Sequence, residues 1–112
     1  MGRRLVPPRR CVVIHLVDTV DVRAQDVDAY LDAFRKYYLT GATERGMELV
    51  ACWHTPVDIG DVVSVMVVFA LPGWEEWERI RNVGVRDRRM ATWVERRRAL
   101  VLHGTRRFYE PA

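Results

Sequence analysis

His15 is the residue of this sequence best suited to acid–base chemistry. It is the single polar residue in the apolar run CVVIHLV, residues 11–17. A buried polar group must find a hydrogen-bond partner, and an imidazole titrates near neutral pH. His15 is therefore a candidate general base in a pocket between a sheet and its helices. The alternative is a neutral core histidine, bonded to a backbone carbonyl or to Ser64.

The other two histidines, His54 and His103, are weaker candidate catalytic residues. His103 lies within residues 100–109, a predicted strand that would border the first strand and could bring this histidine near the first one. Gly104 beside it indicates a bulge or a close backbone approach. His54 ends the predicted strand at residues 47–54, where a partly exposed structural histidine is the alternative. Three histidines without a close-spaced pair are a weak metal signal, so we expect no metal site and no cofactor.

Aromatic side chains are numerous enough to wall a pocket for an aromatic ligand. The candidate substrate-binding residues are Trp53, Ser64, Tyr37, Tyr38, Trp77, Met90 and Trp93. Helical or strand spacing of such residues is equally typical of a plain hydrophobic core, which is the alternative. Asp18 is expected in a turn after the first strand and is a minor candidate. Neither Cys11 nor Cys52 has a catalytic context, and no glycine-rich phosphate loop is present.

Four segments are predicted strands, and two of them are apolar on both faces. Residues 62–70 are apolar apart from one serine, and residues 11–17 are apolar apart from one histidine. Strand side chains alternate between two faces, so an almost unbroken apolar run indicates that both faces are covered. The other two predicted strands are residues 47–54 and 100–109.

Two helical regions separate these strands. Residues 26–39 place apolar side chains at i, i+3, i+4 and i+7 spacing, which indicates one amphipathic helix. A second region begins near Trp74, is interrupted at residues 82–84 and resumes after Asp87, a residue type that caps helices. The predicted order of elements is therefore β-α-β-β-α-β.

This order predicts an α+β fold, a ferredoxin-like sandwich with both helices on one face of an antiparallel sheet. Such packing covers only one face of the two most apolar strands. Leaving the other face in water would forgo about 1.5–3 kcal/mol for each large apolar side chain. A second copy of the same sheet is the simplest cover, so we expect a homodimer with two sheets face to face.

The arrangement resembles the dimeric α+β barrel superfamily, and within it NIPSNAP-like and antibiotic-biosynthesis-monooxygenase-like proteins. The resemblance rests on residues 46–70, GMELVACWHTPVDIGDVVSVMVVFA. Here a glycine opens a strand that ends in Trp53, and an apolar strand runs into a Trp-bearing helix. Residues 93–111 are similar to the last helix and strand of NIPSNAP-like chains. The likeness has no invariant catalytic signature.

The resemblance implies a range of activities. The superfamily includes cofactor-free monooxygenases, polyketide cyclases, lactone isomerases and haem-binding enzymes. No predicted helix of this chain contains a histidine, which counts against a helix-borne haem ligand. We expect a small cofactor-independent enzyme that acts on an aromatic or polyketide-like molecule. The chemistry would be His-assisted proton transfer (a cyclase, isomerase or lyase) or oxygenation. The alternative is a non-catalytic ligand-binding or dimerisation module of the same fold.

RNA binding is the third function considered, because RNA-recognition domains share the β-α-β-β-α-β order. Their third strand presents exposed aromatic and basic residues, whereas residues 62–70 contain one Phe and no charge. The chain is basic, with a net charge of +3, but its basic clusters are split between residues 1–10, 86–89 and 96–98. We therefore expect no nucleic-acid partner.

The length of 112 residues predicts one domain, residues 11–112, preceded by a flexible basic arm at residues 1–10. Two cysteines are too few for a disulfide scaffold. No apolar run reaches the ~20 residues that cross a bilayer, and the N-terminus lacks an apolar signal segment. We expect a cytoplasmic protein without membrane contact.

Overall fold

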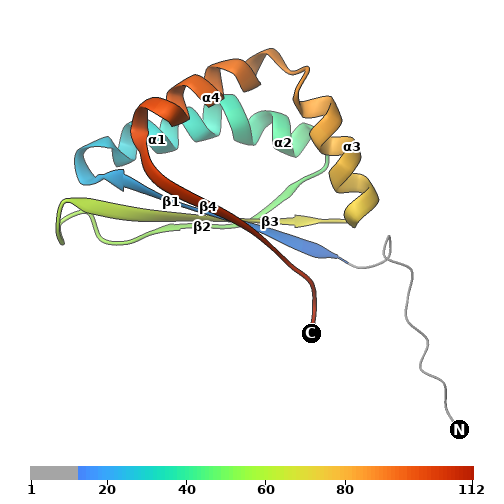
Figure 1. Cartoon of the computed structure of the whole chain (residues 1–112), viewed down its shortest axis with the longest axis horizontal. Helices are drawn as coiled ribbons and strands as arrows, with labels where there is room; N and C mark the ends of the chain where they lie inside the picture. The colour runs from blue at the N-terminus through green and yellow to red at the C-terminus, as the bar shows by residue number, and fades with distance from the viewer. Residues whose placement is uncertain (1–12) are drawn as a thin grey trace, which may run out of the picture.

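A computed structural model describes residues 13–112, and their arrangement is shown in Figure 1. The predicted arm and Cys11 lie outside the described residues. The strands are β1 (Ile14–Arg23), β2 (Glu48–His54), β3 (Val62–Leu71) and β4 (Val101–Tyr109). They form an antiparallel sheet in the order β2-β3-β1-β4.

All the helices of the described chain lie on one face of this sheet (Figure 1). They are η2 (Ala24–Asp26), α1 (Val27–Ala33), η3 (Phe34–Leu39), α2 (Thr40–Glu44), α3 (Trp74–Gly84) and α4 (Arg88–Leu100). The first four follow one another without a break, and η3 is a π-helical turn within them. The predicted ferredoxin-like α+β fold is confirmed. None of the helices in residues 13–112 is long and apolar enough to cross a membrane. The expected cytoplasmic location stays a prediction.

Two boundaries differ from the prediction for physical reasons. β1 continues to Arg23 instead of ending at residue 17, because its polar residues find partners across the sheet. Ser64 Oγ, for example, donates a hydrogen bond of 2.6 Å to Asp21 Oδ1. The first helical segment continues to Glu44, and Gly46 then takes a positive φ of 101° that only glycine adopts without strain.

The break between α3 and α4 is a short turn with a strong cap, as predicted for Asp87. Asp87 Oδ1 accepts a hydrogen bond of 2.9 Å from the backbone N–H of Arg89. Asp87 Oδ2 also accepts one of 2.9 Å from Arg45 Nη1, at the end of α2. The cap therefore ties α4 to α2 as well as starting the helix.

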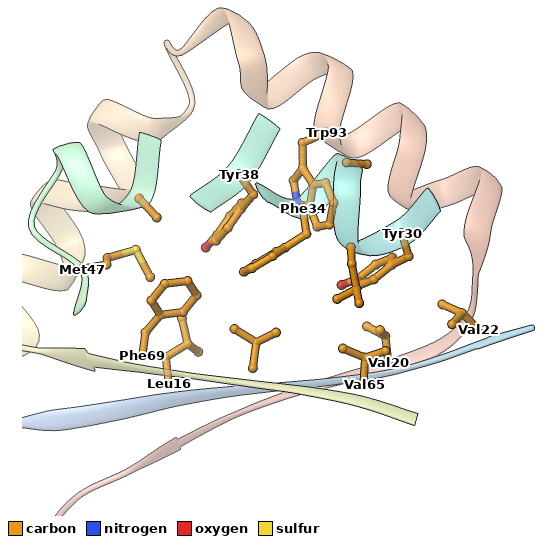
Figure 2. Packing of buried hydrophobic residues seen from close by; sticks show 14 of the residues in the cluster. Leu16, Val20, Val22, Tyr30, Phe34, Tyr38, Met47, Val65, Phe69 and Trp93 are labelled. Atoms are coloured by element: carbon orange, nitrogen blue, oxygen red, sulfur yellow. The ribbon is translucent and has the colours of Figure 1, made fainter. Parts of the chain in front are cut away.

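The hydrophobic core lies between the helices and one set of alternating strand residues (Figure 2). This set comprises Ile14, Leu16, Val20, Val22, Val63, Val65, Val67, Phe69 and Leu71, all buried. The helices contribute aromatic rings, among them Tyr30, Phe34, Tyr38 and Trp93. The buried members of β1 decide which way that strand faces, because their neighbours must point to the opposite side.

The opposite side of the sheet, called the helix-free face below, also has an apolar centre. Val17 and Val68 are half-buried there and lie opposite each other on β1 and β3. Met66 is 38% exposed, and Trp53, its cross-strand partner on β2, is 62% exposed. The predicted two-sided hydrophobicity is therefore present, and within residues 13–112 no element covers this second face (Figure 1).

Candidate functional site

A pocket of about 390 Å³ lies between the sheet and the helices. Its apolar wall includes Val20, Phe34, Val67, Ile80, Met90 and Trp93. Trp93 from α4 is central: its ring centroid lies 5.6 Å from Tyr30 and 5.6 Å from Tyr38, with Phe34 at 6.0 Å (Figure 2). A cavity of this size with aromatic walls suits a small organic molecule.

An ion pair between Asp18 and Arg106 supplies polar groups to the pocket wall that the sheet forms. The two residues are cross-strand partners on β1 and β4, so both side chains point to the helix side. Arg106 donates two hydrogen bonds, from Nε to Asp18 Oδ1 at 2.8 Å and from Nη2 to Asp18 Oδ2 at 3.0 Å. The guanidinium also lies over the ring of Trp77, 5.6 Å from its centroid.

Arg106 stays charged at this place. Burial works to lower the pKa of its guanidinium, but the hydrogen bonds and the charge of Asp18 outweigh burial and raise that pKa. A charged guanidinium beside an apolar cavity is a strong donor to a ligand oxygen, because its fork keeps further N–H groups available.

Two tyrosine hydroxyls are further polar groups of the pocket. Burial raises the pKa of Tyr30, and Arg97 opposes that rise. Burial likewise raises the pKa of Tyr38, and Arg106 opposes it. Both phenols therefore keep their proton at neutral pH and act as hydrogen-bond donors, each near an arginine.

The π-helical turn η3 positions Tyr38. A π turn holds more residues than an α turn, and Thr40 Oγ1 donates a 3.0 Å hydrogen bond to the carbonyl oxygen of Arg35, five residues earlier. Phe34 and Tyr38 both reach the pocket, whereas Tyr37 is only half-buried and lies under the ammonium of Lys36. Such turns are frequent at functional sites, and hydrophobic spacing along the sequence does not reveal them.

Arg45 closes another part of the pocket. Its side chain is 10% exposed, and it donates to Asp87 through Nη1, while its Nε is buried without a partner among the described residues. Gly84 leaves room for this side chain, because a Cβ at Gly84 would lie 3.3–3.4 Å from the guanidinium.

None of the three predicted catalytic histidines lines this pocket. His15 is half-buried on the helix-free face, because its neighbours Ile14 and Leu16 are the buried, helix-facing residues. His103 is exposed and pairs with Asp21, whereas His15 pairs with Tyr109. Those two positions are six residues apart along β4, roughly 20 Å. The predicted approach of His103 to His15 is conditional on a register that allows it, and this register does not.

His54 is exposed at the end of β2, which agrees with the alternative interpretation of a partly exposed structural histidine. Its Nδ1 lies 2.7 Å from the carbonyl oxygen of Thr55, the next residue. The expectation of a turn at Asp18 is also wrong, since Asp18 lies in the middle of β1 and lines the pocket. Within residues 13–112, no group of three or more His, Cys, Asp or Glu side chains is arranged to hold a metal ion.

The predicted substrate-binding residues divide into two groups. Those that line the pocket are Tyr38, Trp77, Met90 and Trp93. Ser64 and Trp53 belong to the helix-free face, and Tyr37 lines a separate hollow with Lys36. The pocket residues that sequence reasoning missed include Tyr30, Arg45, Arg97 and Arg106. The available signal was the alternation of β4, which puts Gly104, Arg106 and Phe108 on one face.

No family model matches this sequence, and no curated protein does. Solved structures match over most of its length. A NIPSNAP family protein of unknown function from Agrobacterium tumefaciens has a TM-score of 0.73 at 17% identity, over 91% of this chain and 90% of that chain. The chain has the fold of that NIPSNAP protein. The predicted resemblance is confirmed at the level of fold.

Two further solved structures with other names are similar to this chain in fold. A protein from Nitrosomonas europaea, named as a candidate antibiotic biosynthesis monooxygenase, has a TM-score of 0.67 at 11% identity, over 96% of this chain and 95% of that chain. A dimeric ferredoxin-like protein from an uncultured marine organism has a TM-score of 0.65 at 8% identity, over 94% and 92%. At these identities the similarity shows the fold alone.

Proposed function

We propose that this protein binds a small aromatic or polyketide-like molecule in the pocket and transfers a proton on it. The observation that carries the proposal is the Asp18–Arg106 pair in the wall of a cavity whose lining is mostly aromatic and aliphatic. A few convergent polar groups in an apolar pocket are typical of small-molecule sites. The fold also occurs in a candidate antibiotic biosynthesis monooxygenase, which is compatible with such a ligand.

The roles follow from the donors and acceptors present. Arg106 and Tyr38 are donors, and they would hold a carbonyl or phenol oxygen of the ligand. Asp18 is the acidic residue that lines the pocket, and each of its oxygens keeps a lone pair beyond its bond to Arg106. It would accept a proton from the carbon next to the carbonyl, while the negative charge that develops on the ligand oxygen is stabilised by the two donors.

Proton transfer is assigned to Asp18 because the histidines lie outside the pocket. The resulting enolate is a starting point for cyclisation or isomerisation, and also for attack on dioxygen in an oxygenation. Each of these reactions can begin without a bound cofactor. The choice among them depends on the ligand.

A non-catalytic ligand-binding module is the second candidate function. It is favoured by the bidentate contact, because both oxygens of Asp18 already accept a hydrogen bond from Arg106. The two functions predict the same class of ligand. They differ in whether the protein removes a proton from the bound ligand.

The test uses 2-tetralone, a bicyclic aromatic ketone with acidic α-protons, in deuterated buffer. Catalysis predicts faster exchange of the α-protons, followed by NMR, and a loss of roughly 10²–10⁴-fold in Asp18→Asn. Asp28→Asn is the matched control, since Asp28 is exposed on α1. Binding of 2-tetralone without faster exchange would support the non-catalytic ligand-binding module. If none of the aromatic ketones tried binds, both functions are contradicted.

We further propose that a second copy of the chain covers the helix-free face. The proposal is supported by the apolar centre of that face, with Met66 38% and Trp53 62% exposed. A protein of the same fold is named as dimeric. Two packed sheets lie ~10 Å apart, a distance that side chains of this size fill.

A further inference from the structure

The pocket carries positive charge that the protein itself leaves unbalanced. Its lining includes four arginines and one acidic residue, Asp18. Arg106 is paired with Asp18, and Arg45 is paired with Asp87. Arg97 and Arg81 have no hydrogen bond or ion pair with any residue in 13–112, and Arg81 is exposed to water. Arg97 is thus a half-buried cation that has no counter-ion within residues 13–112.

Gly104 makes room for the guanidinium of Arg97. A Cβ at Gly104 would lie 2.5 Å from Arg97 Nη2 and 3.7 Å from its Cζ, so any other residue would displace the group. Gly104 belongs to the helix side of β4, opposite Val20. The guanidinium therefore packs against the strand at the pocket wall, and its stem comes from α4.

Tyr30 provides a second donor close to Arg97. Tyr30 is a buried residue, burial raises the pKa of its phenol, and the charge of Arg97 opposes that rise. The hydroxyl has no hydrogen-bond partner among the described residues. A charged donor and a neutral donor thus line the same pocket without a hydrogen-bond acceptor among the described residues, and the ring of Tyr30 lies 5.6 Å from that of Trp93.

We propose that this end of the pocket binds a carboxylate, so that the ligand is an aromatic acid. The planar fork of arginine matches a carboxylate with two parallel hydrogen bonds. Gly104 and Arg106 are two positions apart on the same side of β4, a separation of ~7 Å. One aromatic ring system spans that distance, with its carboxylate at Arg97 and its reacting oxygen at Arg106. The assignment rests on the proposed function and names its substrate class.

The experiment compares an acid with its neutral isostere. Calorimetry measures the binding of 2-naphthoate and of 2-naphthamide, which have nearly the same shape and differ in charge. We expect the unmodified protein to bind the acid at least about tenfold more tightly than the amide, the usual worth of a charge-assisted pair. Arg97→Met keeps an apolar stem and should remove the preference for the acid, with a much larger loss of affinity for the acid than for the amide.

Two further variants distinguish loss of the carboxylate contact from a folding defect. Arg98→Met removes an exposed arginine from the same helix and should keep the preference for the acid. Gly104→Ala leaves every charge in place but displaces the guanidinium of Arg97, so it should weaken binding of the acid alone. Binding of the amide that is retained in each variant shows that the pocket is intact.

Each other outcome overturns a defined part of the assignment. Equal affinity of the unmodified protein for acid and amide would overturn the carboxylate site and leave the aromatic pocket standing. A preference for the acid that persists in Arg97→Met would show that another group holds the anion. Failure of both probes to bind would contradict the proposed aromatic ligand, and the carboxylate site with it.

Discussion

Asp18 and Arg106 lie directly opposite each other on β1 and β4, joined by two hydrogen bonds of 2.8 and 3.0 Å. They are 88 positions apart in the sequence, and the pairing of the first and last strands brings them together. Their side chains are 23% and 43% exposed, so water reaches the pair from one side. This contact places a carboxylate and a guanidinium in the wall of an apolar pocket.

A double-mutant cycle with Asp18→Asn and Arg106→Gln should show a modest coupling energy in unfolding. We expect about 0.5–1.5 kcal/mol, because a partly exposed pair is screened by solvent. The effect on ligand binding should be larger than the effect on stability, since both groups face the pocket. Denaturant unfolding and calorimetric titration of the four proteins measure the two effects. A coupling energy near zero in both would show that the pair does not act as a unit.

Substitutions of Asp87 should separate its capping role from its charge. Hydrogen bonds from Arg89, and further bonds from Arg45, hold the pKa of Asp87 well below its usual range. Asp87→Asn keeps an oxygen for the helix cap but leaves Arg45 without its counter-ion. Asp87→Ala also loses the cap, so it should be less stable than Asp87→Asn by about 1 kcal/mol. Equal stability of the two variants would contradict the capping role.

The stabilisation by Asp87 should depend on pH in a defined direction. A carboxyl whose pKa is lowered by folding contributes stability at pH values above its unfolded pKa of about 4, and that contribution decreases as the pH falls further. The difference in unfolding free energy between the unmodified protein and Asp87→Asn should therefore be smaller near pH 3 than near pH 7. Urea unfolding at the two pH values measures it, and a constant difference would contradict the ion pair.

The two pocket tyrosines should make the fold sensitive to alkaline pH. Burial raises the pKa of Tyr30 and of Tyr38, so the folded protein keeps these protons after the unfolded chain has lost them. Their contribution to stability is complete below the unfolded pKa of about 10 and decreases as the pH rises above it. A Tyr30→Phe/Tyr38→Phe double variant should lose less stability between about pH 9 and pH 11 than the unmodified protein. A parallel loss in both would contradict the buried phenols.

Met66→Asp should abolish the proposed dimer. Met66 lies on the helix-free face, where a carboxylate from each copy would be buried without a partner. Val65→Asp is the contrasting change: Val65 is fully buried on the helix side, so this variant should fail to fold. Sedimentation velocity at micromolar concentration distinguishes the two outcomes. A folded monomer of the unmodified protein at that concentration would contradict the dimer.

His15→Gln should leave the chemistry of the pocket unchanged. Glutamine keeps a hydrogen-bonding side chain of similar size, and His15 lies on the face of the sheet that points away from the pocket. We expect binding and α-proton exchange of 2-tetralone to stay within about twofold of the unmodified protein, whereas acid–base residues contribute 10²–10⁴-fold. A 10²–10⁴-fold loss of α-proton exchange in His15→Gln would make His15 a catalytic candidate again and would contradict the role of Asp18 as the base.

The fold followed from local patterns in the sequence. Apolar runs, helical spacing and the cap at Asp87 are properties of neighbouring residues, so they predicted the strands, both helical regions and their order. Tyr38, Trp77, Met90 and Trp93 were picked as ligand-binding candidates for the same reason. Aromatic residues on the inner face of a helix are near any cavity beneath it.

The polar part of the site depended on contacts between distant segments. An apolar run covered on both faces does not reveal which face the helices take, and this choice moved His15 away from the pocket and Asp18 into it. Burying an aspartate side chain in a strand costs free energy when the carboxylate has no partner, and an arginine opposite it offsets that cost. The register of β1 against β4 is what places Arg106 opposite Asp18. The π turn that directs Tyr38 inward, and the space at Gly104 that admits Arg97, likewise arise from packing between elements rather than from local spacing.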